Sequence, residues 1–364
     1  MTSKRNSNLE LLRIIAMAMI IGLHYFNGNM GGALGQVKPP HYNFYITYLL
    51  ESAFIVGVNC FVLITGYFMI EKKSMSMNRV IELLIMMLFY ALVFYLFALS
   101  IGLIQWNPKE LLKTMMPFFH DNRRWFIKTY IILYMLSPFL NIIINTLDRK
   151  NYKILLCILL ILFTIWPSFF PGAPSNDYGY GIITFVILYA IGGWLRKYYH
   201  ADSSKSFYLA GYIISALLTF SSSVISYSIF GISKVWGYNY IFNMTGGVCL
   251  FLFFSKLKID SRAVNYIAKF SLGVFLIHSD FSLKTLINNI ILRCQDFYYS
   301  PFFILHALGS IIALYAVSVP IDIGRNFLFE RFWRIIGGKI KNTFPAIWRP
   351  VDASMRDDSL HPES

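Results

Sequence analysis

The chain has 364 residues, of which 57% are hydrophobic, 18% aromatic and only 14% charged. With a mean hydropathy of +0.56, this composition excludes a soluble globular protein and indicates an integral membrane protein. The formal net charge is +14, but the basic residues fall in short clusters between apolar runs. The charge therefore reflects membrane topology, and nucleic acid is not an expected partner.

Apolar runs long enough to cross a hydrocarbon layer roughly 30 Å thick recur along nearly the whole chain. We predict an all-α, polytopic membrane protein with about ten transmembrane helices. The predicted spans cover residues 9–27, 46–70, 79–104, 125–146, 152–171, 179–199, 207–228, 238–256, 266–287 and 300–321. They form a transmembrane domain over residues 1–324, and residues 325–364 are expected to form a basic, amphipathic cytoplasmic tail.

The segments between these spans differ in charge. With the N-terminus inside, the inner segments carry 22 of the 32 Lys and Arg residues and the outer segments carry 8, while Arg13 and Lys284 lie within spans. Cytoplasmic loops of membrane proteins are enriched in Lys and Arg, so this distribution predicts that both termini are cytoplasmic.

The first span contains two ionisable residues, Arg13 and His24, within an apolar run. At about 100° per residue their spacing places both side chains on one face of a helix, about 16 Å apart along its axis. Ionisable groups inside a membrane are costly and suggest a functional site. Two other interpretations remain open, namely that Arg13 anchors the helix at the cytoplasmic interface and that His24 packs between helices.

Two further groups of polar residues stand near predicted membrane boundaries or within spans. Arg123, Arg124 and Trp125 lie where the fourth span begins on the outer side, and are interpreted either as a substrate site or as an ordinary interfacial cluster. His278 lies late in the ninth span and either lines the cavity of His24 or forms hydrogen bonds between helices. The sequence contains no motif for a metal site or a soluble-type nucleotide site.

These residues resemble the membrane-bound acyltransferase family 3, and the resemblance covers nearly the whole chain. Its most specific element is the first-helix pattern of a basic residue, ten residues and a histidine, which here runs from Arg13 to His24. Residues 59–68, Asn-Cys-Phe-Val-Leu-Ile-Thr-Gly-Tyr-Phe, are similar to the second-helix pattern, with Thr65 in place of the usual serine. Residues 125–141 and 271–278 are similar to the fourth-helix signature and to the late Leu-Gly-Val-Tyr-Leu-Ile-His element. The basic pair that often enters the third helix is reduced to Ser76 and Arg79.

The resemblance implies an acyl-CoA donor, usually acetyl-CoA, and a sugar hydroxyl of a bacterial surface polysaccharide or exopolysaccharide as acceptor. It places the protein in the bacterial cytoplasmic membrane, with lipid-linked or nascent polysaccharide as partner and no metal. His24 is the expected catalytic base or acyl carrier, assisted by Arg13. Arg13 and Arg79 are expected to bind the phosphates of the donor. The expected acceptor-side residues are Arg123, Arg124, Trp125 and His278.

Two functions of other classes remain as alternatives. In a polysaccharide flippase or other transporter, Arg13 and His24 would bind the substrate or relay protons. A glycan polymerase would also act on lipid-linked sugars, but we would expect it to have a large outer loop.

Overall fold

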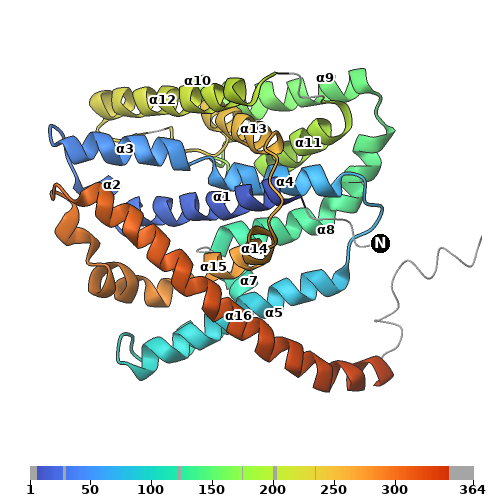
Figure 1. Ribbon diagram of the computed structural model, residues 1–364, viewed down its shortest axis with the longest axis vertical. Coiled ribbons are helices and arrows are strands. Elements are labelled where there is room, and N and C mark those ends of the chain that lie inside the picture. The colour runs from blue at the N-terminus through green and yellow to red at the C-terminus, as the bar shows by residue number, and fades with distance from the viewer. Residues whose placement is uncertain are drawn as a thin grey trace, which may run out of the picture.

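The structure is a computed structural model that describes residues 6–27, 30–120, 124–173, 175–199, 203–233 and 235–343, without the side chains of residues 120 and 330–343. In this part of the chain the regular elements are all helical, which confirms the predicted all-α class (Figure 1). The helices of the first half are α1 (Ser7–Phe26), α2 (Ala33–Gln36), α3 (Tyr42–Phe54), α4 (Gly57–Met69), α5 (Met77–Ser100), α6 (Pro108–Met115), α7 (Pro117–His120) and α8 (Trp125–Thr146). Those of the second half are α9 (Arg149–Leu160), η2 (Ile161–Ile165), α10 (Trp166–Phe169), α11 (Ile182–Tyr198), α12 (Lys205–Phe230), α13 (Ile241–Ser255), α14 (Arg262–Ile267), η3 (Ala268–Phe270), α15 (Ser271–His278), η4 (Phe281–Leu283), η5 (Leu286–Ile291), η6 (Cys294–Phe297) and α16 (Phe303–Thr343).

The described chain contains seven helical segments that are long and apolar enough to cross a membrane, or eight if one bent pair forms a single span. This confirms a polytopic membrane protein, while the ten spans and their orientation stay a prediction. Two of the ten predicted ranges hold shorter helices, α11 with 17 residues and α13 with 15. The predicted span 46–70 corresponds to the combined segment of α3 and α4, which runs from Tyr42 to Met69.

The predicted helix over residues 266–287 is not continuous. The segment Arg262–His278 meets the segment Phe281–Ile291 at an angle of 58°. At the break, Ser279 Oγ donates to the carbonyl of Phe275, and Asp280 Oδ1 accepts from the backbone N–H of Ser282 at 2.9 Å. Side chains of Ser and Asp compete with the helical backbone in this way, so the local sequence favours an end to the helix directly after His278.

Helix α1 lies inside the bundle and packs against α3, α4, α13, α15 and α16. In contrast, α9, α12 and α16 are largely exposed and form the periphery, where their apolar side chains would face lipid (Figure 1). The site described below therefore forms around a buried helix.

Helices α4 and α11 approach one another closely because glycines line their contact. A Cβ at Gly66 would lie 2.1 Å from the backbone oxygen of Tyr189, and one at Gly192 would lie 2.4 Å from that of Leu63. Small residues allow such contact between membrane helices. Asn141 of α8 adds a polar contact to this region, because its Nδ2 donates to the carbonyl of Met69 at 2.7 Å.

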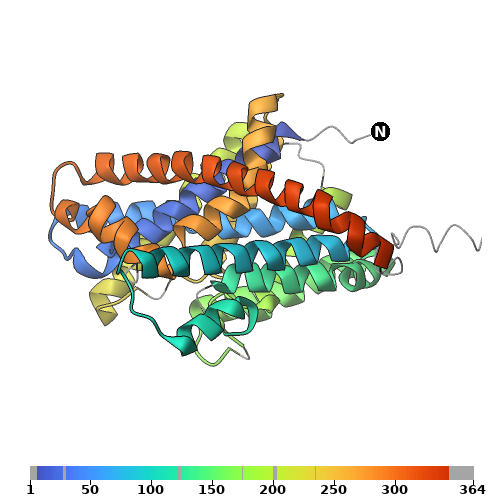
Figure 2. The same ribbon diagram turned by 90° about the horizontal axis from the view of Figure 1, so that it is seen from below.

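Helix α16 runs without interruption from Phe303 to Thr343, and Figure 2 shows it as one helix along the length of the bundle. The predicted tail thus begins within a helix that also forms the last predicted span.

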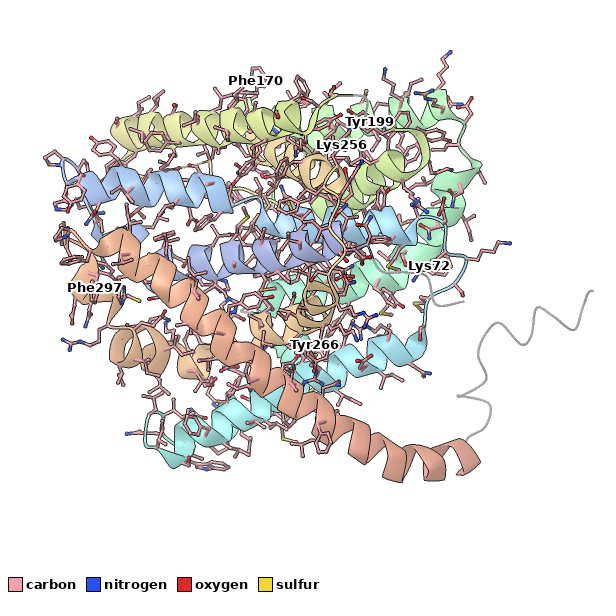
Figure 3. All side chains as sticks on the ribbon, viewed as in Figure 1. Lys72, Phe170, Tyr199, Lys256, Tyr266 and Phe297 are labelled. Atoms are coloured by element: carbon pink, nitrogen blue, oxygen red, sulfur yellow. The ribbon has the colours of Figure 1, made fainter. Side chains whose placement is uncertain are left out.

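Lys72 and Phe297 lie at opposite ends of the molecule, with Lys72 at the end from which α5 starts (Figure 3).

Candidate active site

A cavity of about 600 Å³ lies beside the first half of α1. Its wall combines residues of α1, α4, α5, α8, the segment around η3, and α16. The basic and acidic residues in this wall are Arg13, Arg79, Glu82, Lys269, Asp322 and Arg325. Four cationic side chains against two carboxylates make the cavity suitable for an anionic ligand.

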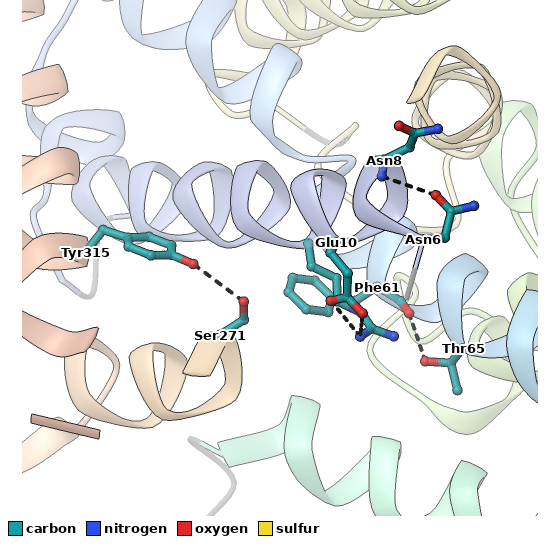
Figure 4. Close-up of polar contacts among 8 residues, drawn as sticks. Asn6, Asn8, Glu10, Phe61, Thr65, Ser271 and Tyr315 are labelled. Atoms are coloured by element: carbon teal, nitrogen blue, oxygen red, sulfur yellow. Dashed lines mark hydrogen bonds and ion pairs between the residues drawn. The ribbon is translucent and has the colours of Figure 1, made fainter. Parts of the chain in front are cut away.

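Arg13 lines this cavity and is held by the preceding turn of its own helix. Its Nη1 lies 3.1 Å from Oε2 of Glu10, an i,i+3 contact on the same helix. Arg13 is 30% exposed and Glu10 only 8%, so the carboxylate fixes the guanidinium from the buried side. Figure 4 shows Glu10 together with Thr65, whose hydroxyl donates to the carbonyl of Phe61 at 2.9 Å.

Arg79 lines the same cavity from the first turn of α5. Its Nη1 lies 2.7 Å from Oε2 of Glu82, and both side chains are about half exposed. The structure therefore brings Arg13 and Arg79, the two residues predicted to bind the donor, to one cavity.

His24 lies deeper along α1, beside His278 of α15. Their ring centroids are 4.9 Å apart, with the rings inclined at 45°. His278 Nδ1 lies 2.6 Å from the carbonyl oxygen of Val274, so this nitrogen is assigned as the donor. His278 Nε2 and His24 Nδ1 are buried and have no hydrogen-bond partner among the residues that the structure describes. Buried polar atoms in proteins are nearly always paired, so two unpaired ring nitrogens in contacting residues suggest a site for a ligand.

Aromatic side chains separate the cavity from the histidine pair. Phe126 lines the cavity, and its ring lies 5.3 Å from the ring of Phe275. The ring of Phe275 in turn lies 6.2 Å from that of His24. Phe126 and Phe275 thus stand between the cationic cavity and His24.

The residues predicted for the acceptor have distinct surroundings. Arg124 is buried, and its Nη2 lies 2.5 Å from Oδ2 of Asp280, two positions after His278. The ring of Trp125 lies 4.5 Å from that of Tyr180 and 5.4 Å from that of Tyr238. Arg123 lies outside the described residues.

Asp322, Arg325 and Lys269 also line the cavity, although they belong to none of the sites predicted from the sequence. One signal was available: Asp322 and Arg325 have the i,i+3 spacing of an ion pair at the end of an apolar run. Within the described residues no group of three or more His, Cys, Asp or Glu side chains is arranged to hold a metal ion.

A model of acyltransferase family 3, described as an acyltransferase domain, matches residues 6–323. This range includes α1, the histidine pair and the first part of α16, and it ends two residues before Arg325 of the cavity wall. No curated protein and no solved structure matches the chain. Because the family model covers nearly the whole chain, the protein belongs to acyltransferase family 3 and is a multi-pass membrane acyltransferase.

Proposed function

We propose that the protein transfers an acetyl group from acetyl-CoA to a hydroxyl of a cell-surface or exopolysaccharide sugar, in the cytoplasmic membrane of a bacterium. The observation that carries this proposal is the contact between His24 and His278, which is linked through the rings of Phe275 and Phe126 to a cavity with four basic side chains. A histidine beside an anion-binding cavity offers a base for the acceptor and a place for a charged donor.

His24 acts as the general base in this proposal. It takes the proton of the sugar hydroxyl while the hydroxyl oxygen attacks the carbonyl carbon of the thioester. The tetrahedral intermediate then collapses, the C–S bond breaks, and His24 returns the proton to the departing thiolate. His278 keeps Nδ1 bonded to Val274, so its Nε2 is an acceptor that stabilises the protonated form of His24.

The donor and the acceptor approach this pair from two sides. The phosphates of acetyl-CoA bind near Arg13 and Arg79, and the thioester arm extends past Phe126 over the distance of about 16 Å that separates Arg13 from His24 along α1. The sugar of a lipid-linked or nascent polysaccharide approaches from the side of Trp125, whose aromatic face suits the apolar face of a sugar ring. Arg124, held by Asp280, positions the segment that follows His278.

The test uses purified full-length protein in lipid vesicles, with acetyl-CoA labelled on the acetyl group. The acceptor is surface polysaccharide from the source organism from which ester-linked acetyl groups have been removed by mild base. We expect label in the polysaccharide, removable by mild base, and an equal amount of free CoA. Movement of polysaccharide across the vesicle membrane without labelling would instead identify a transporter, and polymer growth without labelling would identify a polymerase.

A further inference from the structure

Arg325 of α16 forms a buried ion pair inside the cationic cavity. Its Nε lies 2.5 Å from Oδ1 of Asp322, and the two side chains are only 8% and 1% exposed. Replacing a buried ion pair by apolar residues is often neutral or stabilising, so the stability of the bundle alone does not explain this pair. Both residues line the cavity, which suggests a role toward its ligand.

The carboxylate of Asp322 is fixed by three helical elements. Tyr90 of α5 donates its hydroxyl to Oδ1 at 2.6 Å, and Arg325 binds the same oxygen. On the other side, the carboxylate packs against the backbone of α15 at Gly273. Asp322 is therefore a rigid partner for the guanidinium.

Among the described residues, Asp322 and Phe329 both help to orient the guanidinium of Arg325. Asp322 binds its Nε edge, and its central carbon lies 5.5 Å from the centre of the Phe329 ring. Since a guanidinium has five N–H donors in a planar fork, the Nη groups are those it offers to a ligand in the cavity. A planar fork of this kind matches the oxygens of a phosphate group.

Two other cations share the cavity with Arg325. Lys269 has no carboxylate within ion-pair distance among the residues that the structure describes, and its ammonium lies 5.6 Å from the centre of the Tyr266 ring. In the described part of the chain, Arg79 pairs only with the half-exposed Glu82. An anion in the cavity would thus be attracted by at least one cation that lacks a carboxylate partner.

We propose that Arg325 binds a phosphate group of the acyl donor, with Asp322 as its positioning residue and Lys269 as a second cation. Arg325 thereby determines that the protein prefers a phosphorylated, nucleotide-linked thioester over a thioester without phosphate. This inference rests on the proposed function and adds to it the residue that selects the donor.

The test compares acetyl-CoA with S-acetylpantetheine, which carries the same thioester but neither phosphate nor nucleotide. The ratio of kcat/KM for the two donors is measured for the wild type, for Arg325→Gln, and for the double variant Arg325→Gln/Asp322→Asn. The double variant removes both charges, so no unpaired buried carboxylate remains. We expect the ratio to fall about 10- to 100-fold in both variants, mainly through a higher KM for acetyl-CoA, as for a lost hydrogen bond to a charged group.

Arg196→Gln is the matched control. Arg196 also forms an ion pair, with Glu71 at 3.4 Å, but it does not line the cavity. The ratio of kcat/KM for the two donors in Arg196→Gln should therefore equal that of the wild type. If Arg325→Gln lowers the activity with both donors equally, Arg325 has a structural role only, and the inference is overturned. An unchanged ratio of kcat/KM for the two donors in both Arg325 variants would also overturn the inference.

Equilibrium binding of labelled CoA to the same proteins separates this inference from the proposed function. Binding that weakens about 10-fold or more in Arg325→Gln supports the inference even if no acetyl transfer is found. Adenosine 3′,5′-bisphosphate should compete with the bound CoA, whereas added phosphatidylglycerol should not. Competition by the lipid alone, or equal CoA binding by the wild type and Arg325→Gln, would contradict the assignment.

Discussion

The carboxylate of Asp322 occupies the space that a side chain at position 273 would need. A Cβ on Gly273 would lie 2.0 Å from Cγ of Asp322. Helix α15 carries Gly273 together with His278, and α16 carries Asp322 together with Arg325. This one contact therefore joins the helix of the histidine pair to the helix of the cationic cavity.

Gly273→Ala should destabilise the protein, because either Asp322 or the backbone of α15 has to move. We expect a loss of about 1–3 kcal/mol, as for other overpacked sites, seen as a lower unfolding temperature in detergent. Gly309→Ala is the control, since a Cβ at Gly309 meets no atom within 4 Å. Equal unfolding temperatures of the two variants would show that the contact does not constrain the helices.

His278→Asn should separate catalysis from folding. The amide nitrogen of Asn can replace Nδ1 as the donor to Val274, but no atom of Asn replaces the unpaired Nε2. We expect kcat for acetyl transfer to fall on the order of 100-fold, while the unfolding temperature stays close to that of the wild type. Wild-type kcat in this variant would show that Nε2 takes no part in the reaction.

The pair of Arg124 and Asp280 should be coupled in stability. Removing one partner leaves a buried charge, so Arg124→Gln should cost about 3–5 kcal/mol. In the double variant Arg124→Gln/Asp280→Asn no charge remains, and Asn can still cap Ser282. The double variant should therefore be more stable than the sum of the single effects predicts, as measured by unfolding in detergent. Strictly additive losses would indicate that the two side chains do not interact.

The sequence was sufficient for those features that depend on helical periodicity and hydrophobicity. The all-α class of the protein follows from its apolar runs. The family pattern identified the segments of His24 and His278 separately. The 4.9 Å contact of their rings required the packing of α1 against α15.

Other features were not predicted, for two different reasons. The break after His278 has a local cause, because Ser279 and Asp280 bond to nearby backbone, but both residues lie within an apolar run long enough for a continuous predicted span. The remaining features depend on packing between distant segments. The partner of Arg325 was close in sequence, but Tyr90, which fixes that pair, lies on α5. Similarly, nothing near Arg124 in the sequence indicates that it pairs with Asp280.

The central claim is that the imidazole of His24 carries the acyl transfer. The most direct test measures the rate of acetyl transfer from acetyl-CoA in His24→Ala and in the wild type. His41→Asn is the control, because Asn can keep the capping contact that His41 makes at the start of α3. We predict a loss on the order of 10²- to 10⁴-fold in His24→Ala, with CoA binding retained and His41→Asn close to the wild type. A His24→Ala protein that transfers acetyl groups at the wild-type rate would contradict the account.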